Sequence, residues 1–122
     1  MTALPQDAPL VLVVDDDEDS RRLLELVLKK NQFRVLSVPT GEAAIDYARQ
    51  QMPALVLLDV LMPGLDGFET CRALRGLPGG EHLPIVMLTT LDDDESIDRA
   101  YRVGATDFAT KPIQARLLGQ RL

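Results

Sequence analysis

The chain has 122 residues, 46% hydrophobic and 26% charged, and its formal net charge of −6 argues against nucleic-acid binding, because phosphate backbones select basic surfaces. This size and composition are typical of one globular domain, and the single cysteine, Cys71, excludes an internal disulfide and fits a reducing compartment. The longest apolar runs, such as Leu10–Val14, are far too short for a membrane span, and the amino terminus does not resemble a signal peptide. We therefore predict a cytoplasmic protein without a membrane segment.

Five short segments are predicted to form strands, and the continuous apolar runs among them have the composition of strands in a parallel sheet that is covered on both faces. In chain order they are Leu10–Val14, Phe33–Val38, Leu55–Leu58, Ile85–Leu88 and Thr106–Ala109. Residues 1–7 precede this pattern and are predicted to form a flexible tail, so the domain is expected to span residues 8–122.

Amphipathic helices are predicted after the strands, and a residue that favours a helix start opens each of them. The expected caps are Asp19 or Ser20, Thr40, Asp66 and Asp92, and Pro112 suits the first turn of a fifth helix. Apolar positions at helical spacing are Leu23, Leu24, Val27 and Leu28 in the first helix and Ile97, Ala100 and Tyr101 in the fourth. Five strands alternating with five helices predict a doubly wound α/β domain, with helices on both faces of a parallel sheet.

Polar residues follow the predicted strands at the points where the strands end. Asp15 and Asp16 follow the first strand, Asp59 the third, Thr89 the fourth and Lys111 the fifth. Because ligands of such sheets bind outside the carboxyl ends of the strands, we expect these groups to share one crevice. Three carboxylates placed together repel one another and need a cation, and Mg²⁺ binds carboxylates and phosphate oxygens. One carboxylate can then act as a nucleophile and form an aspartyl phosphate.

Four segments together resemble the receiver domain of two-component response regulators. They are Val13–Asp17, Leu57–Gly67, Ile85–Thr89 and Lys111-Pro112, in this order. The spacing is 30 residues from Asp59 to Thr89 and 22 from Thr89 to Lys111. The resemblance extends from Leu10 to the end of the chain. It implies the flavodoxin-like strand order 2-1-3-4-5 and a regulatory domain rather than an enzyme.

The resemblance implies a metal-dependent phosphorylation site. Asp59 would accept the phosphoryl group from a sensor histidine kinase or a phosphotransfer protein. Asp15 and Asp16 would form an acidic pair beside it. Asp16, Asp59 and the backbone carbonyl of Leu61 would bind Mg²⁺ directly, and Mn²⁺ is expected to substitute for Mg²⁺.

The resemblance also implies a conformational switch. Thr89 would be the hydroxyl that moves toward the phosphate, and Lys111 would contact a phosphate oxygen, with a cis bond to Pro112. Phe108 stands at the position of the switch aromatic, whose ring would turn inward as Thr89 moves. This motion would change the face formed by the fourth helix, the fifth strand and the fifth helix.

Three residues depart from the pattern of the family. Leu61 and Leu91 stand two positions after Asp59 and Thr89, where polar side chains of the family help to orient the hydrolytic water. Thr90 takes the place of a usually smaller residue and is expected to narrow the access of water. We therefore expect the phosphoryl group to be lost slowly.

The partners and the output follow from the resemblance only in outline. Phosphorylation is expected to promote a homodimer through the face named above. The stretch Ala105–Ile113, with Leu117–Leu122, is similar to receivers fused to domains of cyclic-di-GMP synthesis or hydrolysis. The last helix is therefore expected to be truncated before a linker or an output domain.

Other functions remain open from the sequence. A dehalogenase-type phosphatase would need a second aspartate two positions after Asp59, where the chain has Leu61. A flavin module would need a phosphate cradle after the first strand, where Asp15–Asp19 would repel it. The main alternative is a receiver-like docking module that works without phosphorylation. In the plainest interpretation, the acidic run only caps a helix and Phe108 is only a core aromatic.

Overall fold

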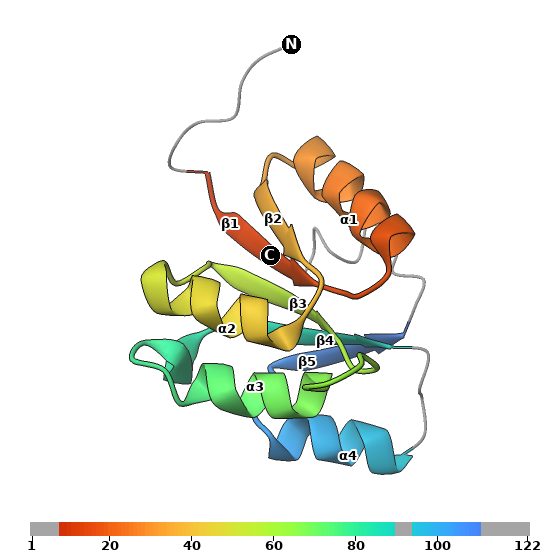
Figure 1. Cartoon of the computed structure of the whole chain (residues 1–122), viewed down its shortest axis with the longest axis vertical. Coiled ribbons are helices and arrows are strands. Elements are labelled where there is room, and N and C mark those ends of the chain that lie inside the picture. Colours follow the sequence, from red (N-terminus) through yellow and green to blue (C-terminus); the bar gives the residue numbers. More distant parts are fainter. Residues whose placement is uncertain (1–7, 90–93, 111–122) are drawn as a thin grey trace.

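The computed structural model describes residues 8–89 and 94–110 and contains one parallel sheet (Figure 1). Its strands are β1 (Leu10–Val14), β2 (Arg34–Val38), β3 (Leu55–Asp59), β4 (Ile85–Thr89) and β5 (Asp107–Thr110). The spatial order is β2-β1-β3-β4-β5, and all neighbours are parallel. The predicted fold class and strand order are therefore confirmed. The three central strands are buried along their whole length, which explains their continuous apolar sequence.

Helices cover both faces of this sheet. They are α1 (Glu18–Lys30), α2 (Gly41–Gln50), α3 (Gly67–Arg75) and α4 (Asp94–Arg102), with a 3₁₀ turn, η1, at Gly80–His82. α1 packs on one face, and α2, α3 and α4 form a layer on the other (Figure 1). No described helix is both long and apolar enough to cross a membrane. The predicted fifth helix lies outside the described residues.

The strands feed two separate cores because successive side chains point to opposite faces. In β1, Val11 and Val13 pack with α1, whereas Leu12 and Val14 pack with the layer of α2, α3 and α4. All four valine and leucine side chains are almost fully buried. The sheet is thus held from both sides, and its strand ends form a rigid base for the groups that follow them.

Two of the predicted helix caps are confirmed. The Thr40 hydroxyl accepts a hydrogen bond from the Ala43 N–H at 3.1 Å and opens α2. Asp66 opens α3 in a capping box, in which Glu69 N–H donates to the Asp66 carboxylate at 2.8 Å and the Glu69 carboxylate accepts from the Asp66 N–H at 3.4 Å. The cap predicted at Asp92 lies outside the described residues.

The predicted start of α1 is wrong by two to three residues. Asp17, rather than Asp19 or Ser20, is the cap, and its carboxylate accepts from the Asp19 N–H at 3.2 Å. The chain turns as soon as β1 ends, because the Asp15 carboxylate accepts from the Asp17 N–H at 3.0 Å. Any acid of the run has the chemistry of a cap, so composition alone did not distinguish among them.

Two apolar residues lie outside the faces where the sequence pattern places them. In α1, Leu24 and Leu28 are buried, but Leu23 is 57% exposed. In α4, Ala100 is buried, but Tyr101 is 49% exposed, and its hydroxyl lies 3.5 Å from the Asp107 carboxylate. A helix that lies on a sheet buries only a narrow stripe, so neighbours of the stripe can be apolar without being covered.

Candidate metal centre at the strand ends

The sheet register brings three of the predicted site residues to one edge. Asp15 follows β1 directly, and Asp59 and Thr89 are the last residues of β3 and β4. β3 lies between β1 and β4, with Asp59 paired to Leu88 in the adjoining strand. The strand order and register thus place these three residues at the carboxyl ends of neighbouring strands.

The carboxylates of Asp15, Asp16 and Asp59 form an acidic cluster. One oxygen from each of the three lies within 4.8 Å of the others. Asp15 and Asp59 are only 2% and 7% exposed, whereas Asp16 is open to solvent. Like charges at such a distance repel, by up to a few kcal/mol per pair at an effective dielectric constant of about 20. The cluster therefore favours a cation that can share the oxygens.

Asp15 is held in place through its backbone as well as its side chain. Its N–H donates to the Val38 carbonyl at 3.2 Å, which continues the β1–β2 ladder by one residue. The Arg21 guanidinium donates to the Asp15 carbonyl at 2.8 Å. Arg21 was not among the predicted site residues. Its position in the first turns of α1, after an acidic run, was the only signal in the sequence.

The loop after β3 holds Asp59 and shapes the site around it. The Leu61 N–H lies 3.4 Å from the Asp59 carboxylate, and the Val60 N–H donates to the Leu88 carbonyl at 3.2 Å. Gly67 N–H returns to the Val60 carbonyl at 2.9 Å, which closes the loop. A Cβ atom on Gly67 would clash with the Asp59 carbonyl and lie 2.7 Å from Val60 Cα. The glycine is thus needed where the loop passes behind Asp59.

Mg²⁺ fits the chemistry of this donor set. The cluster offers three carboxylates, two of them buried, and Mg²⁺ prefers oxygen ligands, commonly carboxylates with waters and phosphate. The set contains no histidine or cysteine, which a zinc site would favour. The Leu61 backbone lies beside Asp59 through the N–H contact above, while its side chain is 55% exposed.

The structure describes two of the remaining predicted residues, Phe108 and Thr89, but not the others. Phe108 is in β5, paired with Met87, and its half-buried ring packs against the core shared by α2, α3 and α4. Thr89 is 1% exposed and is paired with Thr110. Lys111, Thr90 and Leu91 lie outside the described residues, so their roles stay predictions.

Comparison with known proteins identifies the family. The model of the response regulator receiver domain family matches residues 11–122. The chain belongs to this family. The receiver domain is 40% identical over 114 residues to the transcriptional regulatory protein AfsQ1 of Streptomyces coelicolor, covering 93% of this chain and 49% of AfsQ1. It is 41% identical over 112 residues to the response regulator PleD of Caulobacter vibrioides, covering 92% of this chain and 25% of PleD. It therefore spans half or less of these relatives.

Solved structures show the same fold in other receiver domains. A putative response regulator from Chloroflexus aurantiacus superposes with a TM-score of 0.89 at 34% identity, covering 94% of both chains. The receiver domain of the sensor histidine kinase PA1611 from Pseudomonas aeruginosa gives a TM-score of 0.86 at 28% identity, covering 93% of both chains. That structure has a magnesium ion coordinated in its active-site cleft. The predicted membership in the receiver family is thus confirmed.

Proposed function

We propose that this receiver domain accepts a phosphoryl group on the Asp59 carboxylate from a sensor histidine kinase or a phosphotransfer protein, in a reaction that depends on Mg²⁺. The observation that carries the proposal is the acidic cluster, in which Asp59, at the end of a central strand, lies within 4.8 Å of Asp15 and Asp16. The magnesium ion in the PA1611 receiver domain supports the choice of metal.

The carboxylates of Asp15, Asp16 and Asp59, with the Leu61 backbone carbonyl, would hold the Mg²⁺, and Mn²⁺ is expected to substitute. When bound, the cation supplies positive charge that offsets both the cluster and the oxygens of the transferred group. Asp15 keeps its own position through the contacts with Val38, Asp17 and Arg21. The site therefore needs little rearrangement before reaction.

Asp59 would act as the nucleophile. One oxygen of its carboxylate attacks phosphorus, the P–N bond of the donor phosphohistidine breaks, and the electron pair of that bond returns to the imidazole nitrogen. The Leu61 N–H lies 3.4 Å from the Asp59 carboxylate and helps to hold this carboxylate in position. Lys111 would contact an oxygen of the transferred group.

Thr89 and Phe108 would transmit the event. The Thr89 hydroxyl would donate to a phosphate oxygen, and the Phe108 ring would move into the space that Thr89 leaves. Phe108 already packs against the core of α2, α3 and α4, so its movement would alter the α4–β5 surface. A homodimer through this surface, with the predicted fifth helix, belongs to the same proposal.

The phosphoryl group would be lost slowly. The Leu61 side chain is exposed and carries no hydrogen-bonding group that would orient a water. A phosphorylated half-life of seconds in the presence of Mg²⁺ would contradict this part of the proposal. A change of Leu61 to glutamine or asparagine is expected to shorten the half-life.

The proposal extends to the output and the location of the protein. A receiver domain of a modulated diguanylate cyclase from Desulfovibrio desulfuricans is 34% identical, with a TM-score of 0.81, covering 93% of this chain and 90% of that one. This supports an output of the cyclic-di-GMP type, in a longer protein for which residues 8–122 are the receiver. A cytoplasmic location fits the buried free thiol of Cys71.

The test is intact-mass measurement after incubation with acetyl phosphate and Mg²⁺. We expect a gain of about 80 Da, the mass of one phosphoryl group, which requires Mg²⁺ and is absent in Asp59→Asn. No adduct on a folded protein with Mg²⁺ present would favour the alternative function, a docking module that works without phosphorylation.

A further inference from the structure

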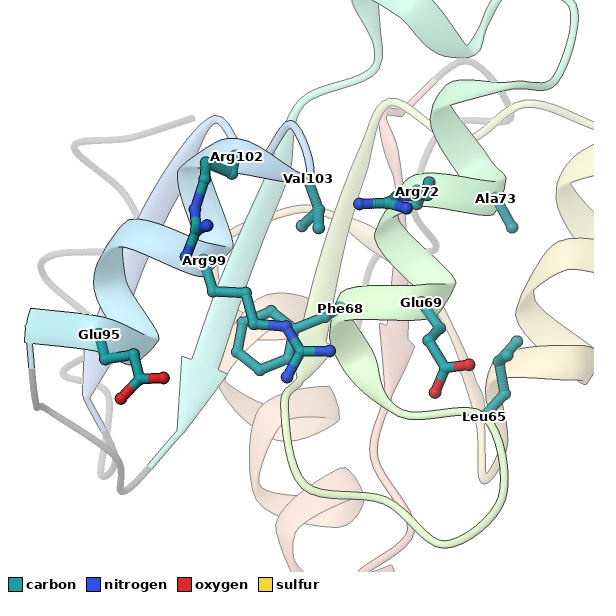
Figure 2. A pocket seen from close by; sticks show the side chains of 9 residues that line it. All are labelled: Leu65, Phe68, Glu69, Arg72, Ala73, Glu95, Arg99, Arg102 and Val103. Atoms are coloured by element: carbon teal, nitrogen blue, oxygen red, sulfur yellow. The ribbon is translucent and has the colours of Figure 1, made fainter.

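A groove of about 780 Å³ lies between α3 and α4 (Figure 2). Three arginines stand along it: Arg72 comes from α3, and Arg99 and Arg102 come from α4. Glu69 and Glu95 lie at the same groove, so its lining carries three positive and two negative side chains. This positive balance occurs in a chain whose net charge is −6.

The three groove arginines have no carboxylate partner within residues 8–89 and 94–110. The ion pairs found in this part of the chain are Arg22–Glu18 and Arg49–Asp46, both on other helices. Glu69 is used elsewhere, because its carboxylate accepts the Asp66 N–H in the capping box of α3. The guanidinium groups thus retain their hydrogen-bonding capacity for an anion from outside the described chain.

The side chain of Arg99 is held in one orientation by the aromatic ring of Phe68. Its guanidinium carbon lies 4.3 Å from the centroid of the Phe68 ring, whose side chain is only 5% exposed at the base of the groove. Figure 2 shows the Arg99 side chain extended across this ring. Such stacking limits the rotamers of arginine, so less conformational entropy is lost when its fork binds a carboxylate.

The groove also continues toward the site of Asp59. A second hollow, of about 610 Å³, shares Phe68 and Arg99 with the first and is lined by the loop from Val60 to Gly64. The charged side chains of the groove are exposed, and an enclosed small-molecule site would bury most of its ligand. An open groove between two helices instead suits a segment of a protein chain.

We propose that the α3–α4 groove docks an acidic peptide segment of a partner protein. Carboxylates of that segment bind Arg72, Arg99 and Arg102 in charge-assisted hydrogen bonds, bidentate where the fork of arginine allows. The choice of an acidic ligand rests on the excess of positive charge in the groove and on the lack of a carboxylate partner for these arginines among the residues that the structure describes. The site is separate from Asp59, and binding does not require phosphorylation.

The test uses a fluorescein-labelled peptide of about ten residues, made of glutamate and glycine, with fluorescence anisotropy as the readout. The triple variant R72Q/R99Q/R102Q is expected to bind the peptide at least about tenfold more weakly than the wild type. The loss of a single charge-assisted hydrogen bond would be enough for this effect. The matched control is R22Q/K30Q/R49Q, which removes the same charge from exposed positions on α1 and α2. It is expected to keep its affinity within about twofold, since it leaves the groove intact.

Two outcomes would overturn the proposal. One is an equal loss of affinity in both triple variants, which would mean attraction by net charge only. The other is displacement of the peptide by ATP or inorganic phosphate with a higher affinity than the peptide itself. The single variant Arg102→Gln, at an exposed position, guards against a folding defect and is expected to weaken binding without a change in thermal unfolding.

Discussion

The two edges of the sheet are built in opposite ways. At the carboxyl edge, three carboxylates of the acidic cluster lie within 4.8 Å of one another. At the amino edge, where the chain enters β4 and β5, one guanidinium joins several segments. Arg75 donates to the Gly104 carbonyl at 2.8 Å, to the Gly80 carbonyl at 2.8 Å and to the Leu83 carbonyl. It also donates to the Thr106 hydroxyl at 3.2 Å.

In this domain the stabilising contacts of Arg75 and the candidate site lie at opposite edges of the sheet. The hydrogen-bonding groups of the Arg75 edge satisfy one another, and the Thr106 hydroxyl in turn accepts the Ile85 N–H at 3.0 Å. The carboxylates of the other edge are gathered where they repel and can bind a ligand. Sites of this kind commonly reduce stability, and other parts of the fold offset the loss. Four predictions separate the two edges.

The largest effect is expected from Arg75→Met, which keeps the apolar stem and removes the guanidinium. Three carbonyls and a hydroxyl lose their donor, so the free energy of unfolding should fall by about 3–5 kcal/mol in urea titrations. The control is Arg72→Met, one turn earlier on an exposed face of α3, with an expected change below about 0.5 kcal/mol. Equal losses in the two variants would show that the amino edge is not held by Arg75.

Gly67→Ala tests the backbone behind the acidic cluster. Its Cβ would meet the Asp59 carbonyl and the Val60 backbone, neither of which can move freely, so we expect a loss of about 3 kcal/mol. Gly76→Ala is the matched control, since φ is −78° there and the nearest atom to a new Cβ is 3.5 Å away. That substitution should change stability by less than about 1 kcal/mol. A tolerated alanine at position 67 would mean that the loop is not tightly constrained.

Cys71 links α3 to the amino edge and makes stability depend on pH. Its thiol lies 3.6 Å from the Val103 carbonyl, and burial, partly opposed by the charge of Arg75, raises the pKa of the thiol from 9.0 to about 11. The folded state thus keeps a proton that the unfolded chain loses above about pH 9. Stability from this group is full below pH 9 and is lost toward pH 11, by about 2–3 kcal/mol.

The measurement for Cys71 is urea unfolding of the wild type and Cys71→Ala at several values of pH between 8 and 10.5. Subtracting the two profiles cancels the titration of other groups. The wild type should be the more stable at pH 8, and its advantage should shrink as pH rises. Parallel profiles would exclude a raised pKa of the thiol.

The smallest change in stability is expected from Asp59→Asn. In the presence of a metal chelator, removal of one charge from the acidic cluster should raise the free energy of unfolding by about 1 kcal/mol, after screening by solvent around Asp16.

Added Mg²⁺ should stabilise the wild type, by about 2.7 kcal/mol at 100 times its Kd, and should stabilise Asp59→Asn much less. Asp98→Asn removes the same charge from an exposed position of α4 and should leave the response to Mg²⁺ unchanged. A loss of stability in Asp59→Asn would contradict repulsion within the cluster.

Much of the fold was predictable from local patterns. All five strands were placed to within one residue at each end. Continuous apolar runs identified the three central strands, because a strand covered on both faces has little room for polar residues. Thr40 and Asp66 were predictable caps, since each stands alone before an amphipathic stretch. The cap of α1 was not, because Asp17 stands in a run of acids with similar capping chemistry.

The acidic cluster was predictable in its residues, but the contacts that support it were not. Asp15, Asp16 and Asp59 follow strands, and the rule for strand ends brings them together. The contacts of Arg21 with Asp15 and of Arg75 with the amino edge depend on the tertiary arrangement of loops. Nothing in the local sequence separates these arginines from solvent-exposed ones. The groove between α3 and α4 likewise appears only once the helices are packed.

The central claim is that the phosphoryl group is carried by Asp59, and borohydride trapping tests it most directly. The domain is treated with acetyl phosphate and Mg²⁺, reduced with sodium borohydride, which converts an acyl phosphate to an alcohol, and digested for peptide mass mapping. We expect the reduced residue at position 59, and unmodified peptides containing Asp15 and Asp16. Reduction at Asp15 or Asp16, or none at all on a folded protein that has bound Mg²⁺, would contradict the account.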